Sequence, residues 1–298
     1  MDYDEILTQL KTVQNLEESN LLIALEKLIL LKNIPILIHE LSVFSGLSLN
    51  FIYNSENPFV FLNLASIKTN LKDHLQFELK EIEFTSENNT PFITFPEGLL
   101  VIQNLTNTFL VEKGLERFEY TTEDILKNNT KFLILETTQV ERKDLYTKDK
   151  FKKIKEEFIN NFTLAISNTN HYEGLTGLME FIKDFSNFNG DKLTNITESF
   201  IEQFSFYYGI YTYTLGMYYF LDRITQNLLN TGISALSDAL MYYREFTRLI
   251  KVRQGNKPFL GQQKKIDENT RRRALNSLKR LFASFEEFVN IIKKIKGV

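Results

Sequence analysis

Apolar and polar positions divide the chain into a front part with mixed periods and a back part with helical periods. Residues 21–31 are apolar on nearly every side, which is typical of a buried helix. Segments 4–15 and 37–46 predict two shorter helices around it. Ser19 or Asn20 is suited to cap the buried helix, because a side-chain oxygen can accept an otherwise unpaired backbone N–H.

From about residue 50 to residue 136 the period changes to that of strands. Short β-branched or aromatic runs are separated there by Asn, Ser, Gly and Pro. They predict a small, mostly antiparallel sheet with one helix at 67–76. The predicted strands are 50–53, 59–62, 78–84, 99–103, 108–113 and 131–136.

The polar and charged segment 138–150 predicts a domain boundary, and every later segment has a helical period. The sequence therefore predicts an α+β fold. A small α/β N-terminal domain, 1–140, is followed by an all-helical domain, 148–298. The predicted helices of the second domain are 148–168, 173–188, 192–229, 232–253 and 266–296.

The amino-acid composition excludes cysteine-based chemistry and shows an uneven distribution of charge. The 298 residues include no Cys, which excludes thiolate nucleophiles, disulfides and Cys-ligated metals. The net charge of −3 is unevenly distributed: residues 251–298 hold 13 basic and four acidic residues, so this tail is +9 and the rest is −12. An acidic body disfavours nucleic acid and leaves an acidic partner or an internal contact for the tail.

The sequence shows no signal peptide, no membrane-spanning segment and no complete zinc-binding motif. The acidic amphipathic start is unlike a signal peptide and no run of about 18 apolar residues occurs, so we expect a cytoplasmic protein without a membrane span. His39-Glu40 begins a zinc-protease motif, but Val43 stands where its second histidine belongs. We therefore expect no metal and no cofactor.

Two segments supply binding candidates. Residues 200–224 are rich in aromatics, which predict a buried core helix or, as the alternative, a pocket wall with tyrosine hydroxyls as polar groups. Gly209 and Gly216 lie seven residues apart on one helix face, where small residues allow another backbone or a ligand to approach closely. Arg272 and Arg273 lie seven residues before Lys279 and Arg280, which predicts a solvated helix face or a contact for phosphate or carboxylate. The tyrosine candidates are Tyr208, Tyr211, Tyr213 and Tyr218.

Two stretches resemble one known family. Leu41–Tyr53, followed by Pro58–Leu62, resembles the N-terminal signature of the butirosin biosynthesis protein H family. Gly209–Asp222 and the following Ile233–Ile250 resemble the helical partner domain of that family. The resemblance implies a papain-like fold and an acyltransferase that moves an acyl group from a carrier protein onto an amine. Tyr53, the last residue of the first stretch, is also a binding candidate.

The chain departs from this family at the catalytic positions. The family carries His-Cys at the start of the buried helix, where this chain has Ser19-Asn20. The family's second histidine lies on a later strand, whereas Leu62–Leu99 contains only His74, on a predicted helix. We therefore predict a degenerate relative without catalytic residues, in which Ser19 and Asn20 are helix caps.

Two hypotheses follow for function. The first is a non-catalytic protein that holds an acyl-carrier-like protein or a small ligand, in a cleft between its two parts or on the basic tail. The alternative is an acyl- or aminoacyltransferase of secondary-metabolite biosynthesis with a replaced active site, in which Ser19 or a carboxylate assists. The sequence does not determine the oligomeric state, and a homodimer is one of the possible states.

Overall fold

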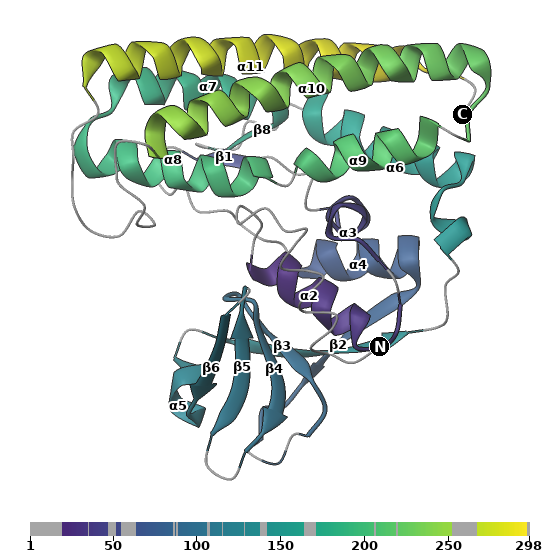
Figure 1. Ribbon diagram of the computed structural model, residues 1–298, viewed down its shortest axis with the longest axis vertical. Coiled ribbons are helices and arrows are strands. Elements are labelled where there is room, and N and C mark those ends of the chain that lie inside the picture. The colour runs from purple at the N-terminus through teal and green to yellow at the C-terminus, as the bar shows by residue number, and fades with distance from the viewer. Residues whose placement is uncertain are drawn as a thin grey trace. The chain divides into compact units, whose positions relative to one another are not determined.

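The fold is α+β, as predicted, in a computed structural model whose described residues form two compact units (Figure 1). The first unit lies within 1–47 and 62–145, and the second within 48–61 and 146–298. The described residues are 20–34, 36–46, 52–54, 64–85, 87, 89–105, 108–114, 116–127, 129–137, 142–163, 171–205, 207–218, 220–251 and 267–296.

The first unit is built on a six-stranded sheet in which neighbouring strands are antiparallel, in the order β2–β7–β3–β4–β5–β6. Four of its strands overlap predicted ones, whereas β3 and β6 were not predicted. The strands are β2 (Phe77–Ile82), β3 (Phe92–Phe95), β4 (Leu99–Asn104), β5 (Phe109–Lys113), β6 (Glu116–Tyr120) and β7 (Lys131–Thr137).

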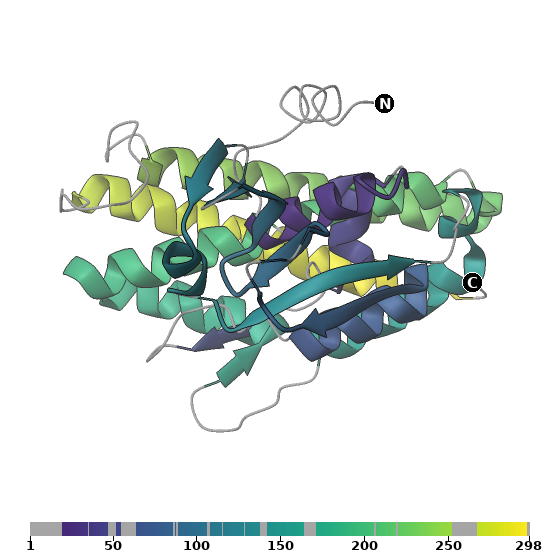
Figure 2. The same cartoon turned by 90° about the horizontal axis from the view of Figure 1, so that it is seen from below.

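One face of this sheet is covered by the buried helix that the sequence predicts. Helix α2 (Asn20–Leu30) contacts β3, β4 and β5, and Leu21 through Ile29 are all buried. Helix α3 (Ile38–Phe44) packs on α2, and α4 (Leu64–Leu75) lies along β2 (Figure 2). The unit also contains α5 (Thr122–Leu126) and a short 3-10 helix, η2 (Arg142–Leu145).

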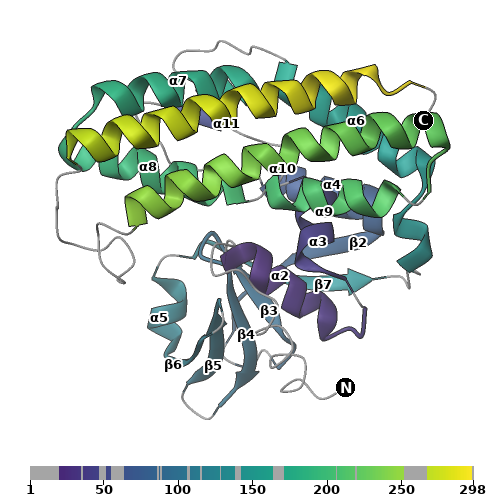
Figure 3. The same cartoon turned by 45° about the horizontal axis from the view of Figure 1, so that its top comes forward.

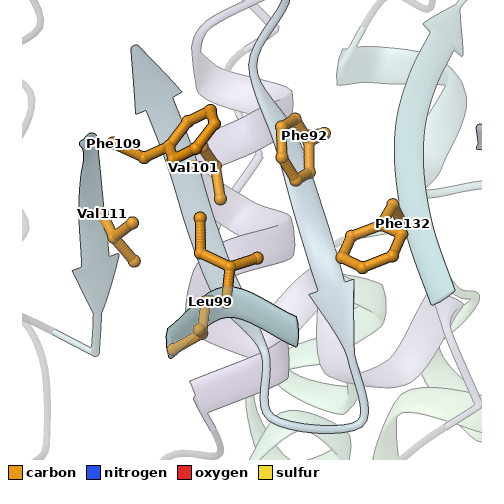
Figure 4. Packing of buried hydrophobic residues seen from close by; sticks show 7 residues of the cluster. Phe92, Leu99, Val101, Phe109, Val111 and Phe132 are labelled. Atoms are coloured by element: carbon orange, nitrogen blue, oxygen red, sulfur yellow. The ribbon is translucent and has the colours of Figure 1, made fainter. Parts of the chain in front are cut away.

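The opposite face of the sheet carries an apolar cluster (Figure 4). Because side chains alternate along a strand, Leu99 and Val101 of β4 enter the cluster together, as do Phe109 and Val111 of β5. By the same alternation the intervening residue 112 of β5 points toward α2. The remaining buried members are Phe92, Ile125 and Phe132.

The second unit contains the helices of the C-terminal half and a two-stranded sheet of β1 (Ile52–Asn54) and β8 (His171–Glu173). Strand β1 overlaps a strand predicted for the N-terminal sheet, yet it pairs with β8 in the second unit. The helices are α6 (Lys148–Thr163), α7 (Gly174–Asn187), α8 (Gly190–Ser205), α9 (Tyr207–Tyr218), α10 (Arg223–Lys251) and α11 (Glu268–Lys294).

Helices α10 and α11 lie side by side and run antiparallel (Figure 3). A Cβ on Gly232, early in α10, would lie 3.7 Å from Phe288, late in α11. Tyr242, further along α10, meets Arg280, which comes earlier in α11. The last turns of α10 and the first turns of α11 are therefore at the same end of the pair.

The predicted helix 192–229 is wrong as one element, because α8, α9 and the start of α10 share this stretch. Asp222 explains the last break: its Oδ1 accepts hydrogen bonds from the N–H groups of Ile224 and Thr225, which caps α10. The separate helix predicted at 232–253 is the continuation of α10. The helix predicted at 4–15 and the strand at 59–62 lie outside the described residues.

Candidate functional site

The start of α2 is where the resemblance places catalytic residues. Asn20 is the first residue of α2, and Ser19 lies outside the described residues. Two turns of the sheet approach this helix end at glycines with positive φ, Gly98 at 68° and Gly114 at 60°. A Cβ on Gly98 would meet the backbone of Leu21, and one on Gly114 would lie 3.1 Å from Oδ1 of Asn20. Glycine therefore lets both turns reach the helix.

The described groups that could take the family's catalytic positions are Asn20 and the histidines of the first unit. An asparagine amide is neither a nucleophile nor a general base at neutral pH. The two histidines described in this unit lie on helices: His39 on α3 and His74 on α4, where it is buried with its ring 6.1 Å from Phe44. Burial lowers the pKa of His39, the attraction of Glu40 opposing it, which favours the neutral imidazole.

A buried ion pair joins α2 to the strand β5. Lys27 is fully buried, and its Nζ donates to Oε2 of Glu112 at 2.7 Å and to the carbonyl of Gly114 at 2.6 Å. Oε1 of Glu112 accepts from Nε of Arg117 at 2.8 Å. Burial lowers the pKa of Lys27, while the hydrogen bond to Glu112 acts in the opposite direction. The pair fixes the Gly114 turn against α2.

The hydroxyl of Tyr53 is engaged in a hydrogen bond within the second unit. It is buried on β1, and its Oη donates to Oδ2 of Asp184 on α7 at 2.7 Å. Its ring meets Phe181 edge-on, with centroids 5.7 Å apart. Burial first, and then the hydrogen bond to Asp184, raise the pKa of Tyr53 well above its ordinary value. The phenol thus ties the two-stranded sheet to α7.

The space beside Gly216 is filled by a side chain of the same unit. A Cβ on Gly216 would meet the ring of Tyr146, which precedes α6. Tyr146 stacks with buried Tyr213 at 5.8 Å and with Phe220 at 5.7 Å, measured between ring centroids. Tyr213 is therefore part of an aromatic row, which matches the core interpretation of the segment.

The remaining tyrosine candidates are not gathered into a site. Tyr218 is exposed near the end of α9, as is Leu215 one turn earlier. Tyr208 and Tyr211 belong to α9, and their side chains lie outside the described residues.

The three consecutive arginines of α11 divide into two roles. Arg271 donates to the carbonyls of Phe185, Ser186 and Phe188, at 2.9, 2.6 and 2.7 Å, and to Oδ1 of Asn189 at 2.7 Å. These carbonyls end α7, so the guanidinium acts as a cap and complements the helix dipole.

Arg272 and Arg273 are both exposed, and neither makes an ion pair with a residue that the structure describes. Sequence periodicity places these two arginines on a surface but does not reveal that their neighbour, Arg271, is structural.

Comparison with known proteins leaves the family resemblance a prediction. No model of a known protein family matches the chain, and no curated protein is similar to it in sequence. Among the described residues, no group of three or more His, Asp or Glu side chains could hold a metal ion. None of the described helices is both long enough and apolar enough to cross a membrane.

Proposed function

We propose that this chain is a non-catalytic binding protein, a degenerate relative of carrier-protein-dependent acyltransferases. Its partner is an acidic acyl-carrier-like protein held by exposed cations of α11. The proposal is carried by Arg272 and Arg273, which are exposed and unengaged among the described residues, while Arg271 is held by four acceptors. Exposed cations remain available to an anionic surface and mainly speed its association.

Charge around these arginines supports an acidic partner. The last turns of α10 and the first half of α11 meet at one end of the antiparallel pair. These segments are residues 241–251 and 267–280. Together they carry eight basic and three acidic residues. A local excess of positive charge on a chain with a net charge of −3 attracts anions to this end rather than to the whole surface.

The groups at the start of α2 support the non-catalytic half of the proposal. Acyl transfer through a covalent intermediate needs a nucleophile with a base in hydrogen-bond reach. Asn20 supplies neither group, and His39 and His74 lie on α3 and α4 rather than on a strand of the sheet. The enzymatic alternative depends on Ser19, which the structure does not describe.

Titration of a labelled, purified holo acyl-carrier protein tests the proposal. Arg272→Glu/Arg273→Glu should weaken the Kd by about tenfold or more, equivalent to about 1.4 kcal/mol. The matched control is Lys32→Glu/Lys127→Glu, which makes the same change in net charge on exposed residues of the first unit. This control should change the Kd by less than about twofold, because it leaves the exposed cations of α11 in place.

Three results would contradict the proposal. An unchanged Kd for Arg272→Glu/Arg273→Glu would show that these arginines of α11 do not contact the partner. An equal loss of affinity in this variant and in the control would show that binding depends on net charge alone. Transfer of an acyl group from the loaded carrier to an amine by the wild-type protein would refute the non-catalytic half. Loss of that transfer in Ser19→Ala would then identify the nucleophile.

A further inference from the structure

The exposed face of α11 carries charges in a regular order. Adjacent residues of like charge recur every seven positions, and all of these residues are exposed. We call this set the charged stripe of α11, and it consists of Arg272–Arg273, Lys279–Arg280, Glu286–Glu287 and Lys293–Lys294.

The seven-residue spacing keeps the pairs of the stripe from neutralising one another. Seven residues rise about 10.5 Å along a helix, and only side chains three or four positions apart meet on its surface. The exposed residues that lie three or four positions from two successive pairs are neutral: Asn276, Ala283 and Asn290. None of the stripe's charges makes an ion pair with a described residue, although Arg280 lies over the ring of Tyr242 at 5.6 Å.

The inner face of α11 repeats with the same period and holds the stripe in register. Buried residues alternate in steps of four and three, as in a helix packed in a bundle. The helix is also tied at both ends, by Arg271 at its start and by Lys155, whose Nζ donates to the carbonyl of Ile295 at 2.7 Å. The inner residues are Ala274, Leu278, Leu281, Phe285, Phe288 and Ile292.

We propose that the charged stripe of α11 is the docking surface for a helix of the protein partner, whose charged pairs repeat every seven residues. Their order is acidic, acidic, basic, acidic along the stripe. This deepens the proposed function and rests on it, because it states how the acidic partner is held. The order provides specificity, since a partner in another order would place like charges together.

The acidic pair within the stripe favours a protein helix over a uniform polyanion. A nucleic acid or an anionic lipid surface presents negative charge along its whole length and would meet Glu286 and Glu287 as well as the cations. A helix can place a basic pair at this position. The stripe is about 33 Å long for residues 272–294 at 1.5 Å per residue, a length that a partner helix with as many residues would cover.

The proposed order of charges can be tested by exchanging a basic and an acidic pair of the stripe and comparing two peptides that differ only in the order of their charged pairs. The probes are two synthetic helical peptides of four heptads with identical composition. In peptide one the charged pairs run Glu-Glu, Glu-Glu, Lys-Lys, Glu-Glu; in peptide two they run Lys-Lys, Glu-Glu, Glu-Glu, Glu-Glu. The variant Arg272→Glu/Arg273→Glu/Glu286→Arg/Glu287→Arg keeps the net charge and reverses two pairs of the stripe.

We expect the wild-type protein to bind peptide one about tenfold more tightly than peptide two, and the exchanged variant to show the opposite preference. Should the exchanged variant fail to fold, Glu286→Arg/Glu287→Arg alone should bind both peptides equally, because each peptide then has one mismatched pair. Equal binding of both peptides by the wild-type protein would overturn the inference.

The failure of this inference can be separated from that of the proposed function. If peptide order is ignored but the carrier protein still depends on Arg272 and Arg273, then the surface is right and the helix order is wrong. If the carrier protein does not depend on these arginines, both proposals fall together.

Discussion

Removing the amine of Lys27 should strongly destabilise the first unit. In Lys27→Met the carboxylate of Glu112, whose side chain is 1% exposed, loses a partner at 2.7 Å but stays buried. Removing one member of a buried pair typically costs about 3–5 kcal/mol of unfolding free energy, because the remaining charge is uncompensated. Arg117 still contacts Glu112, so we expect about 3 kcal/mol, at the lower end.

The matched control is an exposed ion pair of the same chemistry in the same unit. Lys80 and Glu136 lie 2.6 Å apart with side chains 48% and 49% exposed. Lys80→Met should leave the stability unchanged within error, because water solvates the remaining carboxylate. Hydrogen exchange of β4 and β5 amides, followed by mass spectrometry in increasing urea, reports on the first unit by itself.

The pair of variants isolates burial as the cause. The double variant Lys27→Met/Glu112→Leu should recover most of the loss, since it leaves no buried charge at this position. Equal effects of Lys27→Met and Lys80→Met, or no recovery in the double variant, would refute the reasoning from burial.

Three further outcomes are expected. Arg271→Lys should lower the free energy of unfolding by about 1–3 kcal/mol in denaturant titrations, because an ammonium cannot serve four acceptors as a planar fork does. Gly216→Ala should cost about 1–3 kcal/mol in thermal melts by pushing on the Tyr146 ring, and Tyr146→Leu should relieve it. The N–H of Thr225 lowers the pKa of Asp222 below 3.8, so the cap is lost as pH falls through that pKa, and the NMR shift of this amide should follow.

Local patterns explain why much of the fold can be predicted. The continuous apolar run at 21–31 predicts α2, and runs of β-branched and aromatic residues predict β2, β4, β5 and β7. Strands β3 and β6 were missed because Phe92–Phe95 is short and Glu116–Tyr120 is a polar edge strand. Strand β1 was assigned to the wrong sheet because its partner, β8, lies far along the chain.

The site residues depend on contacts that no local pattern contains. Lys27 meets Glu112 from 85 positions away, and Arg271 meets the end of α7 from more than 80 positions away. The sequence offers one signal for the first contact: a lysine on a helix that is apolar on nearly every side must have a buried partner. The arginine run gives no such signal, because Arg271, Arg272 and Arg273 are chemically identical.

Native mass spectrometry of the protein purified from its own host tests the binding claim most directly, with Arg272→Glu/Arg273→Glu purified in parallel. We predict that the wild-type protein carries an acidic protein with the added mass of a pantetheine arm, and that the variant has lost it. Wild-type protein without such a partner, or the same partner on both proteins in equal amount, would contradict the account.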